Sequence, residues 1–200
     1  MPAAAWPDVG RGGEIAALFA DQPGAGTVAG MLEKSVNCPR TSSMGRVFDA
    51  AAGLLGICPK MEFEAQAAIA LEQHATAYIE THGWPAPLDD GWRIDANGEL
   101  DLLPLLDALS SEPDAAYGAA LFHATLVAAL LHWVARAGEE TGIERLTCGG
   151  GCFFNKLLVT GLKEKVPAMG LELLLPQRLL PGDTAISLGQ AWVAMHLLEN

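Results

Sequence analysis

The sequence predicts a helix-rich α/β chain with a small parallel sheet and one β-hairpin. Residues 143–147 are interpreted as a short buried strand that leads into three glycines and then into a helical pattern. The same order of strand, loop and helix returns over residues 171–198, which is typical of a parallel α/β unit. Asn97-Gly98 lies between two short alternating runs, and this dipeptide is a strong local signal for a hairpin.

Composition and charge exclude several classes of protein. The chain has 200 residues, half of them hydrophobic, and a net charge of −12 from 12 basic and 24 acidic residues. Such a chain is globular, and the lack of a Lys/Arg cluster argues against a nucleic-acid partner. The four cysteines do not form a disulfide framework and no secretory signal pattern precedes the domain, so a cytoplasmic location is expected. Residues 115–137 are strongly apolar but contain histidine and threonine, which favours a central buried helix over a membrane span or membrane partner.

The first half of the chain is predicted to be mostly helical. Residues 1–27 form an N-terminal lead-in with a short helix at 14–20, and residues 28–200 form one lobe. An apolar stripe with three- and four-residue spacing marks a helix from Met44 that ends at Gly56. The other helices expected in this half span residues 28–35 and 62–82.

The second half should hold the sheets. The hairpin is expected over residues 92–102, strands over 143–147 and 171–175, and helices over 104–109, 113–138, 153–165 and 183–198. In parallel α/β units, ligands bind where the carboxyl ends of strands meet helix N-termini. The loops at 149–155 and 176–183 occupy these positions.

The first of these loops, Gly149-Gly150-Gly151 followed by Asn155, has the composition of a phosphate site. Glycines allow close approach of an anion, and the helix that follows offers free N–H groups. The same glycines also suit a simple tight turn. In the second loop, Asp183 is either a helix cap or a carboxylate that holds a metal between phosphates.

Other candidates have structural explanations from the residues alone. Arg46 and Asp49 lie three residues apart on one helix, as a solvated ion pair does. His123 and His132 are about 180° apart on their helix, so they cannot share a metal and are expected to be packing residues. Cys148 is expected to be a small apolar filler, as is the nearby cysteine at 152.

Three stretches together resemble the hydrogenase-maturation carbamoyltransferase family HypF. They are Thr41-Ser42-Ser43-Met44-Gly45-Arg46-Val47-Phe48-Asp49-Ala50 with Glu64-Ala65-Gln66-Ala67-Ala68, then Gly149 to Asn155, and Pro181-Gly182-Asp183-Thr184-Ala185-Ile186-Ser187-Leu188-Gly189-Gln190. The second resembles the family's Ser-Gly-Gly-x-x-x-Asn and the third its Asn-Asp-Gly-Gly-Ile-Ser-Leu-Gly-Gln. The likeness extends from about residue 28 to 195 and implies that residues 28–200 are the C-terminal lobe of the transferase domain.

The resemblance implies the second lobe of an actin-like ATPase (ASKHA) fold, which uses ATP through a carbamoyl-adenylate and a divalent metal. It also implies transfer of the carbamoyl group to the C-terminal cysteine of a carrier protein in nickel–iron hydrogenase maturation. By motif position, one group of residues would face the nucleotide's sugar, another its phosphates, and one carboxylate would bind the metal. These residues are Gly45, Arg46 and Asp49 for the sugar, Gly149, Gly150, Gly151 and Asn155 for the phosphates, and Asp183 for the metal. No catalytic residue is assigned.

Some family features are altered or not represented in these residues. Gly149 replaces a serine, Gly182 replaces an asparagine, and Thr184-Ala185 replace two glycines. The first lobe, with its His-x-x-x-His metal pair, is missing and is an expected partner, so the isolated chain is expected to be catalytically incomplete. It could be a fragment, a split subunit or a truncated product. Two alternatives to the hydrogenase function remain open: a small-molecule O-carbamoyltransferase lobe, and a non-catalytic truncated remnant that acts as an interaction module.

Overall fold

The computed structural model describes residues 5–198, which divide into two compact units, Met1–Trp133 and Val134–Asn200. Both units are rich in helix, and each contains one two-stranded sheet. This is the helix-rich α/β architecture, with a small parallel sheet and one hairpin, that the sequence predicts.

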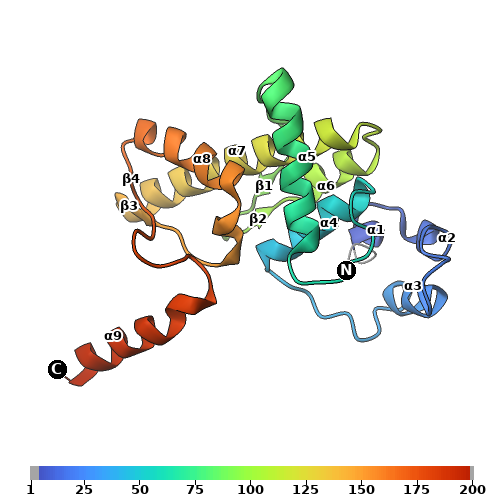
Figure 1. The fold of residues 1–200 in the computed structure, drawn as a ribbon, viewed down its shortest axis with the longest axis horizontal. Helices are drawn as coiled ribbons and strands as arrows, with labels where there is room; N and C mark the ends of the chain where they lie inside the picture. Colours follow the sequence, from blue (N-terminus) through green and yellow to red (C-terminus); the bar gives the residue numbers. More distant parts are fainter. Residues whose placement is uncertain (1–4, 199–200) are drawn as a thin grey trace. The chain divides into compact units, whose positions relative to one another are not determined.

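The first unit consists of helices and one short hairpin (Figure 1). Its elements are α1 (Ala5–Asp8), the 3-10 turn η2 (Gly12–Glu14), α2 (Ile15–Leu18), α3 (Ala25–Glu33), α4 (Met44–Leu54), α5 (Gln66–His82), β1 (Arg93–Ile94), β2 (Leu100–Asp101), α6 (Leu103–Ser110) and the first part of α7 (Ala115–Thr141).

The core of this unit forms where α4 packs against α5 and α6 and meets the buried segment of α7. The rings of Phe48 on α4 and Phe122 on α7 cross edge to face at 5.0 Å, and both side chains are buried. Leu71 from α5 and Leu105 and Leu109 from α6 are fully buried around them. The apolar stripe predicted from residue 44 onward is thus the inner face of α4.

Helix α7 is the buried helix that the sequence predicts, but it continues past the expected end. Gly138 lies inside the helix, and the chain leaves it at Gly142, which has a left-handed φ of +70°. This is the conformation that favours glycine after a helix. By length and composition α7 could cross a membrane, yet 61% of its most apolar window is buried inside the structure, which favours the core-helix interpretation.

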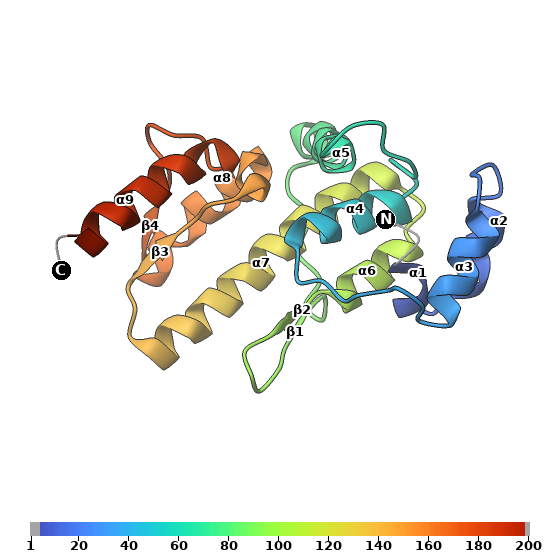
Figure 2. The same cartoon turned by 90° about the horizontal axis from the view of Figure 1, so that it is seen from below.

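The hairpin is confirmed, with strands of only two residues each (Figure 2). Arg93 pairs with Asp101 in an antiparallel register. Two indole N–H groups attach the hairpin to α7. Trp92 donates to His132 Nδ1 at 3.0 Å, and Trp133 donates to the Gly98 carbonyl at 2.7 Å. His132 is therefore a packing residue, as expected.

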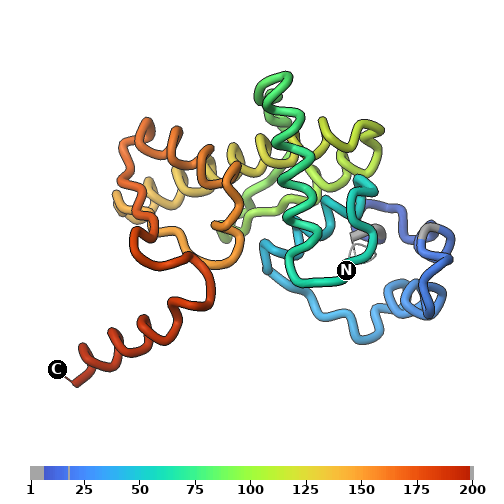
Figure 3. The backbone as a smooth tube through the Cα atoms, viewed as in Figure 1, coloured from blue at the N-terminus to red at the C-terminus, as the bar shows by residue number. Residues whose placement is uncertain are grey.

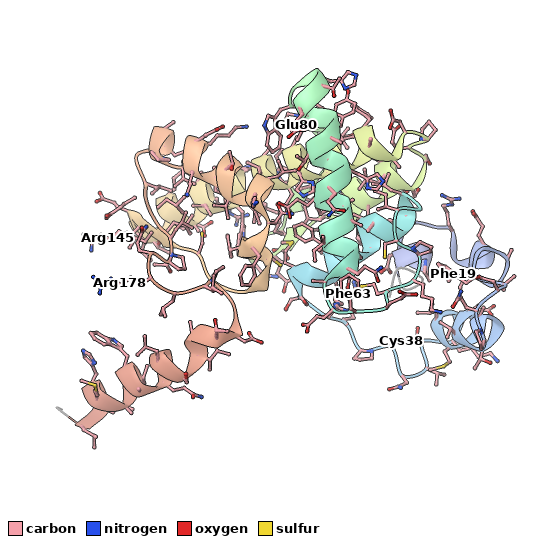
Figure 4. All side chains as sticks on the ribbon, in the orientation of Figure 1. Phe19, Cys38, Phe63, Glu80, Arg145 and Arg178 are labelled. Atoms are coloured by element: carbon pink, nitrogen blue, oxygen red, sulfur yellow. The ribbon has the colours of Figure 1, made fainter. Side chains whose placement is uncertain are left out.

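The second unit is a β–α–β arrangement followed by one further helix. Its elements are β3 (Arg145–Thr147), η3 (Gly151–Phe154), α8 (Lys156–Lys165), η4 (Pro167–Met169), β4 (Glu172–Leu174), η5 (Asp183–Ala185) and α9 (Ile186–Leu198). Strands β3 and β4 pair in parallel, with Leu146 opposite Leu173, which confirms the predicted pairing. The expected burial of residues 143–147 is wrong, because Ile143 is 59% exposed and two of the three β3 residues are exposed. On the surface, Arg145 Nε lies 2.8 Å from a Glu172 carboxylate oxygen (Figure 4).

Helix α9 is apolar but not covered, and none of its described residues is buried. Because successive helical residues advance by roughly 100°, its large side chains fall on two opposite sides. One side carries Ile186, Val193 and Leu197, and the other carries Leu188, Trp192 and Met195. All six are more than half exposed. A helix that is apolar on opposite sides is typical of a protein interior.

Several predicted boundaries are wrong because three non-glycine residues adopt left-handed backbones. Ala65 has a φ of +62°, so α5 begins at Gln66 and not at residue 62. Ser35 and Asn37 have φ values of +53° and +54°, and α3 ends at Glu33 before the open loop that leads to α4 (Figure 3). In the expected lead-in, residues 1–4 lie outside the described part, and residues 5–27 contain α1, η2, α2 and the start of α3. The helix expected over residues 14–20 is α2, which is shorter at both ends.

Candidate functional site

The candidate sugar-side residues lie together at the start of α4. Gly45 and Arg46 belong to its first turn, and Asp49 follows one turn later. Arg46 Nη1 lies 3.0 Å from Asp49 Oδ2. A Cβ atom added at Gly45 would lie 3.7 Å from the Ser43 hydroxyl oxygen, an ordinary van der Waals distance. The space around position 45 would therefore admit a side chain at least as large as that of alanine.

The Arg46–Asp49 pair is not the solvated ion pair that its spacing suggests. The Arg46 side chain is 44% exposed, but that of Asp49 is only 4% exposed. Although Oδ2 is close to Nη1, the contact is not aligned as a hydrogen bond. Among residues 5–198 no other donor meets this oxygen. A buried carboxylate oxygen without a hydrogen bond is unfavourable in a purely structural role, and it could accept a hydroxyl donor from a ligand.

Cys58 lies close enough to Asp49 to be affected by its charge. Burial raises the pKa of the Cys58 thiol, and the negative charge of Asp49 raises it further, while a backbone hydrogen bond with Lys60 opposes the shift. The thiol therefore stays protonated near neutral pH, which does not suit a nucleophile.

In the second unit, the loop after β3 has the geometry expected for close approach of an anion. Gly150 adopts a left-handed φ of +98°, which turns the chain at a position where other residues are strained. A Cβ atom added to Gly149 or Gly151 would meet no atom within 4 Å. The surface above these two glycines is open, and a serine at position 149, as in the family motif, would fit.

Asn155 joins this loop to α8 as the helix N-cap. Its Oδ1 accepts a hydrogen bond from the Leu158 N–H at 2.8 Å, and the residue is 7% exposed. This contact satisfies one of the unpaired N–H groups of the first turn. Asn155 thus caps α8, and its contact with phosphate stays a prediction.

The segment that carries Asp183 lies directly against the glycine loop. The Gly150 N–H donates to the Pro181 carbonyl at 2.6 Å, and a Cβ atom at Gly182 would stand 2.8 Å from the ring of Phe154. Asp183 then opens η5 with an exposed side chain. The two residues that precede Asp183 therefore lie against the glycine loop, and the role of the Asp183 carboxylate stays a prediction. Thr184 follows in an ordinary 3-10 turn, which does not require the family's glycine.

The structure thus brings the candidate residues into two sets, one in each unit. The convergence of Asp49 with Asn155 and Asp183 on one cleft stays a prediction. Within residues 5–198 no group of three or more His, Cys, Asp or Glu side chains could hold a metal ion. Asp183 is a single exposed carboxylate and does not belong to such a group.

The remaining candidates behave as packing residues. His123 is fully buried and contacts the rings of both Phe48 and Phe122 edge to face. Burial lowers its pKa to about 4, although a hydrogen bond to the Ala119 carbonyl opposes the shift. Cys148 is buried at the end of β3, and burial raises its pKa. The expected roles of both residues as core components are confirmed.

Sequence reasoning missed Phe154. Its only signal in the sequence is indirect, because Gly182 replaces the family's asparagine at the position that the ring contacts. Residues 154 and 182 are far apart along the chain, so their contact can be recognised only from the structure.

Comparison with protein families identifies the domain. Residues 4–190 match the model of the second subdomain of the Kae1-like domain of carbamoyltransferases. The chain belongs to this family. Carbamoyltransferase HypF2 of Cupriavidus necator is 46% identical over the whole chain, and a HypF homolog of the same organism is 44% identical over 97% of it.

Solved HypF structures share the fold. Full-length HypF in its phosphate- and nucleotide-bound form covers 88% of the chain with a TM-score of 0.71 and 28% identity. HypF of T. kodakarensis covers 93% with a TM-score of 0.70 and 26% identity. The chain spans 28% of HypF2, 51% of the HypF homolog and about a quarter of each solved HypF chain.

Proposed function

We propose that this HypF-family chain supplies the second, phosphate-binding half of an ATP-dependent carbamoyltransferase site. One observation carries the proposal. The open glycine loop is joined to the segment that presents Asp183, through the 2.6 Å bond from Gly150 to Pro181. In support, one solved relative is described as phosphate- and nucleotide-bound.

The phosphates of ATP would lie over Gly149 and Gly151, where the backbone is open. The start of α8 faces the same loop, and the ten-residue helix contributes a partial positive charge at its N-terminus. Asp183 would hold a divalent metal through one carboxylate while water and phosphate supply the other ligands. Binding by this half alone should be weak.

In the first unit, the buried Asp49 oxygen is suited to accept a hydrogen bond from a nucleotide sugar. Arg46 Nη1, 3.0 Å away, places a positive charge beside this oxygen. Gly45 leaves the α4 N-terminal turn accessible.

The reaction that we propose is carbamoyl transfer through a carbamoyl-adenylate to the C-terminal cysteine of a carrier protein in nickel–iron hydrogenase maturation. Such chemistry needs the reactants oriented and shielded from water between two lobes. The full site would therefore also need the first subdomain of the Kae1-like domain. We expect the reaction to take place in the cytoplasm.

Calorimetry with ATP and Mg²⁺ tests the proposal on the full chain, alone and with the rest of a HypF-type protein supplied as a separate polypeptide. Asp183→Asn should weaken binding about tenfold, and the loss should disappear when Mg²⁺ is omitted. Glu164→Gln removes the same charge from an exposed site on α8 and should have no effect. An absence of heat in every combination would refute nucleotide binding and favour the interaction remnant.

Turnover provides the second test. The combined polypeptides should carbamoylate a cysteine-ended peptide with ATP and carbamoyl phosphate, and this chain alone should not. Turnover by the isolated chain, or transfer to a small-molecule hydroxyl in place of the thiol, would contradict the proposed acceptor and division of the site.

A further inference from the structure

The glycine loop and the Asp183 segment meet at two points. The first is the hydrogen bond from the Gly150 N–H to the Pro181 carbonyl at 2.6 Å. The second is the contact of the Phe154 ring with Gly182. A Cβ atom at position 182 would lie 2.8 Å from Cε2 and 3.2 Å from Cζ of that ring. Real Cβ atoms do not approach other atoms as closely as 2.8 Å, so the ring occupies the space of a side chain at 182.

Gly182 is needed for this contact and not for its backbone conformation. Its φ of −90° and ψ of −162° are extended values that any residue adopts. Glycine at position 182 therefore leaves the space that the ring of Phe154 occupies. The family motif has asparagine at this position, so a large residue at 154 and glycine at 182 form a complementary pair in this chain.

Phe154 is not a core residue that touches Gly182 by chance. It is 53% exposed, so burial in a core does not fix its position, and the contact with Gly182 is made between two surface loops. Phe154 directly precedes Asn155, the cap of α8, and Gly182 directly precedes Asp183. The contact thus fixes the two backbones one residue before each candidate ligand side chain.

We propose that Phe154 is a positioning residue that holds the Pro181–Asp183 segment against the glycine loop and so sets where the Asp183 carboxylate stands relative to bound phosphates. The part that concerns phosphates rests on the proposed function. The part that concerns the two loops does not, because it follows from the contacts at Gly150 and Gly182 alone.

The test is a double-mutant cycle on the full chain with Phe154→Ala, Gly182→Ala and both together. Two quantities are measured: hydrogen exchange of the Gly150 amide by NMR, and affinity for MgATP with the rest of the HypF-type protein present. Each single variant should speed Gly150 exchange and weaken MgATP binding by about tenfold. Gly182→Ala should add nothing once the ring has been removed, because the space is then free.

Phe63→Ala is the matched control, since Phe63 is 58% exposed and lies outside both loops (Figure 4). It should change neither quantity. Phe154→Leu, which keeps an apolar side chain of intermediate size, should restore part of both. Circular dichroism of each variant checks that the fold is retained.

The outcomes separate the two proposals. Unchanged Gly150 exchange in Phe154→Ala, or additive effects of the two substitutions, would overturn the positioning role even if MgATP binds normally. If the parent chain binds no MgATP but Gly150 exchange follows the cycle, the proposed function fails and the loop-holding role of Phe154 stands.

Discussion

The buried histidine of the first unit should make stability depend on pH. His123 is 0% exposed, and burial lowers its pKa from 6.5 to about 4. In the unfolded chain the same imidazole binds a proton near pH 6.5. Between these two values the unfolded state holds more protons, so the free energy of unfolding must fall as the pH is lowered.

The size of the effect follows from the difference between the two pKa values. At about 1.4 kcal/mol for each unit, the full shift corresponds to about 3 kcal/mol, of which about 2 kcal/mol is lost between pH 6.5 and 5. Urea unfolding followed by circular dichroism at pH 7.5, 6.5, 5.5 and 5.0 measures it. This range stays above the ordinary pKa values of carboxylates.

Replacement of His123 by leucine should remove most of this slope, whatever it does to stability at pH 7.5. His82→Gln, which removes an exposed histidine from the last turn of α5, should leave the slope of the parent. If the leucine variant keeps the parent slope, or if the parent is equally stable at pH 7.5 and 5.0, the reasoning from burial is refuted.

Three further predictions concern packing, capping and exposure. Gly118→Ala places a Cβ atom on a methyl group of Leu55 and should lower the free energy of unfolding by about 1–3 kcal/mol; an unchanged urea midpoint would contradict this. Asn155→Ala should cost about 1 kcal/mol through loss of the cap, whereas Asn155→Asp should keep stability but repel phosphate and weaken MgATP binding in calorimetry. The exposed apolar α9 should cause self-association, which Trp192→Glu with Leu197→Glu should reduce in sedimentation; a parent chain that stays monomeric would contradict it.

Local sequence signals were sufficient for much of the fold. The Asn97-Gly98 turn, the apolar stripe of α4 and the glycine loop each depend on neighbours within a few residues, and the structure contains all three. The parallel pairing of β3 with β4 also followed, because one intervening helix leaves little choice of topology. The start of α5 did not follow, since alanine rarely adopts the left-handed backbone that Ala65 has.

Burial of the Arg46–Asp49 pair could not be predicted from its spacing. Two residues three apart near the start of a helix look the same whether that surface faces water or a neighbouring helix. Packing of α4 in the core of its unit decides the outcome, and it covers Asp49 while leaving Arg46 half exposed. Spacing in the sequence likewise does not show that Cys58 is buried near Asp49, where burial and the carboxylate charge raise the pKa of its thiol.

The contact between Phe154 and Gly182 is a second feature, now at the candidate site, that spacing in the sequence does not predict. In the sequence, Gly182 appears only as the loss of an asparagine beside Asp183. In the structure it makes room for a ring from the opposite loop, so one departure from the family motif is compensated by another residue. The motif therefore identifies which loops form the site, but the distance between them depends on a side-chain contact that no spacing records. Because the interaction between two charges weakens as they separate, the proposed contribution of Asp183 to nucleotide binding would depend on this loop contact.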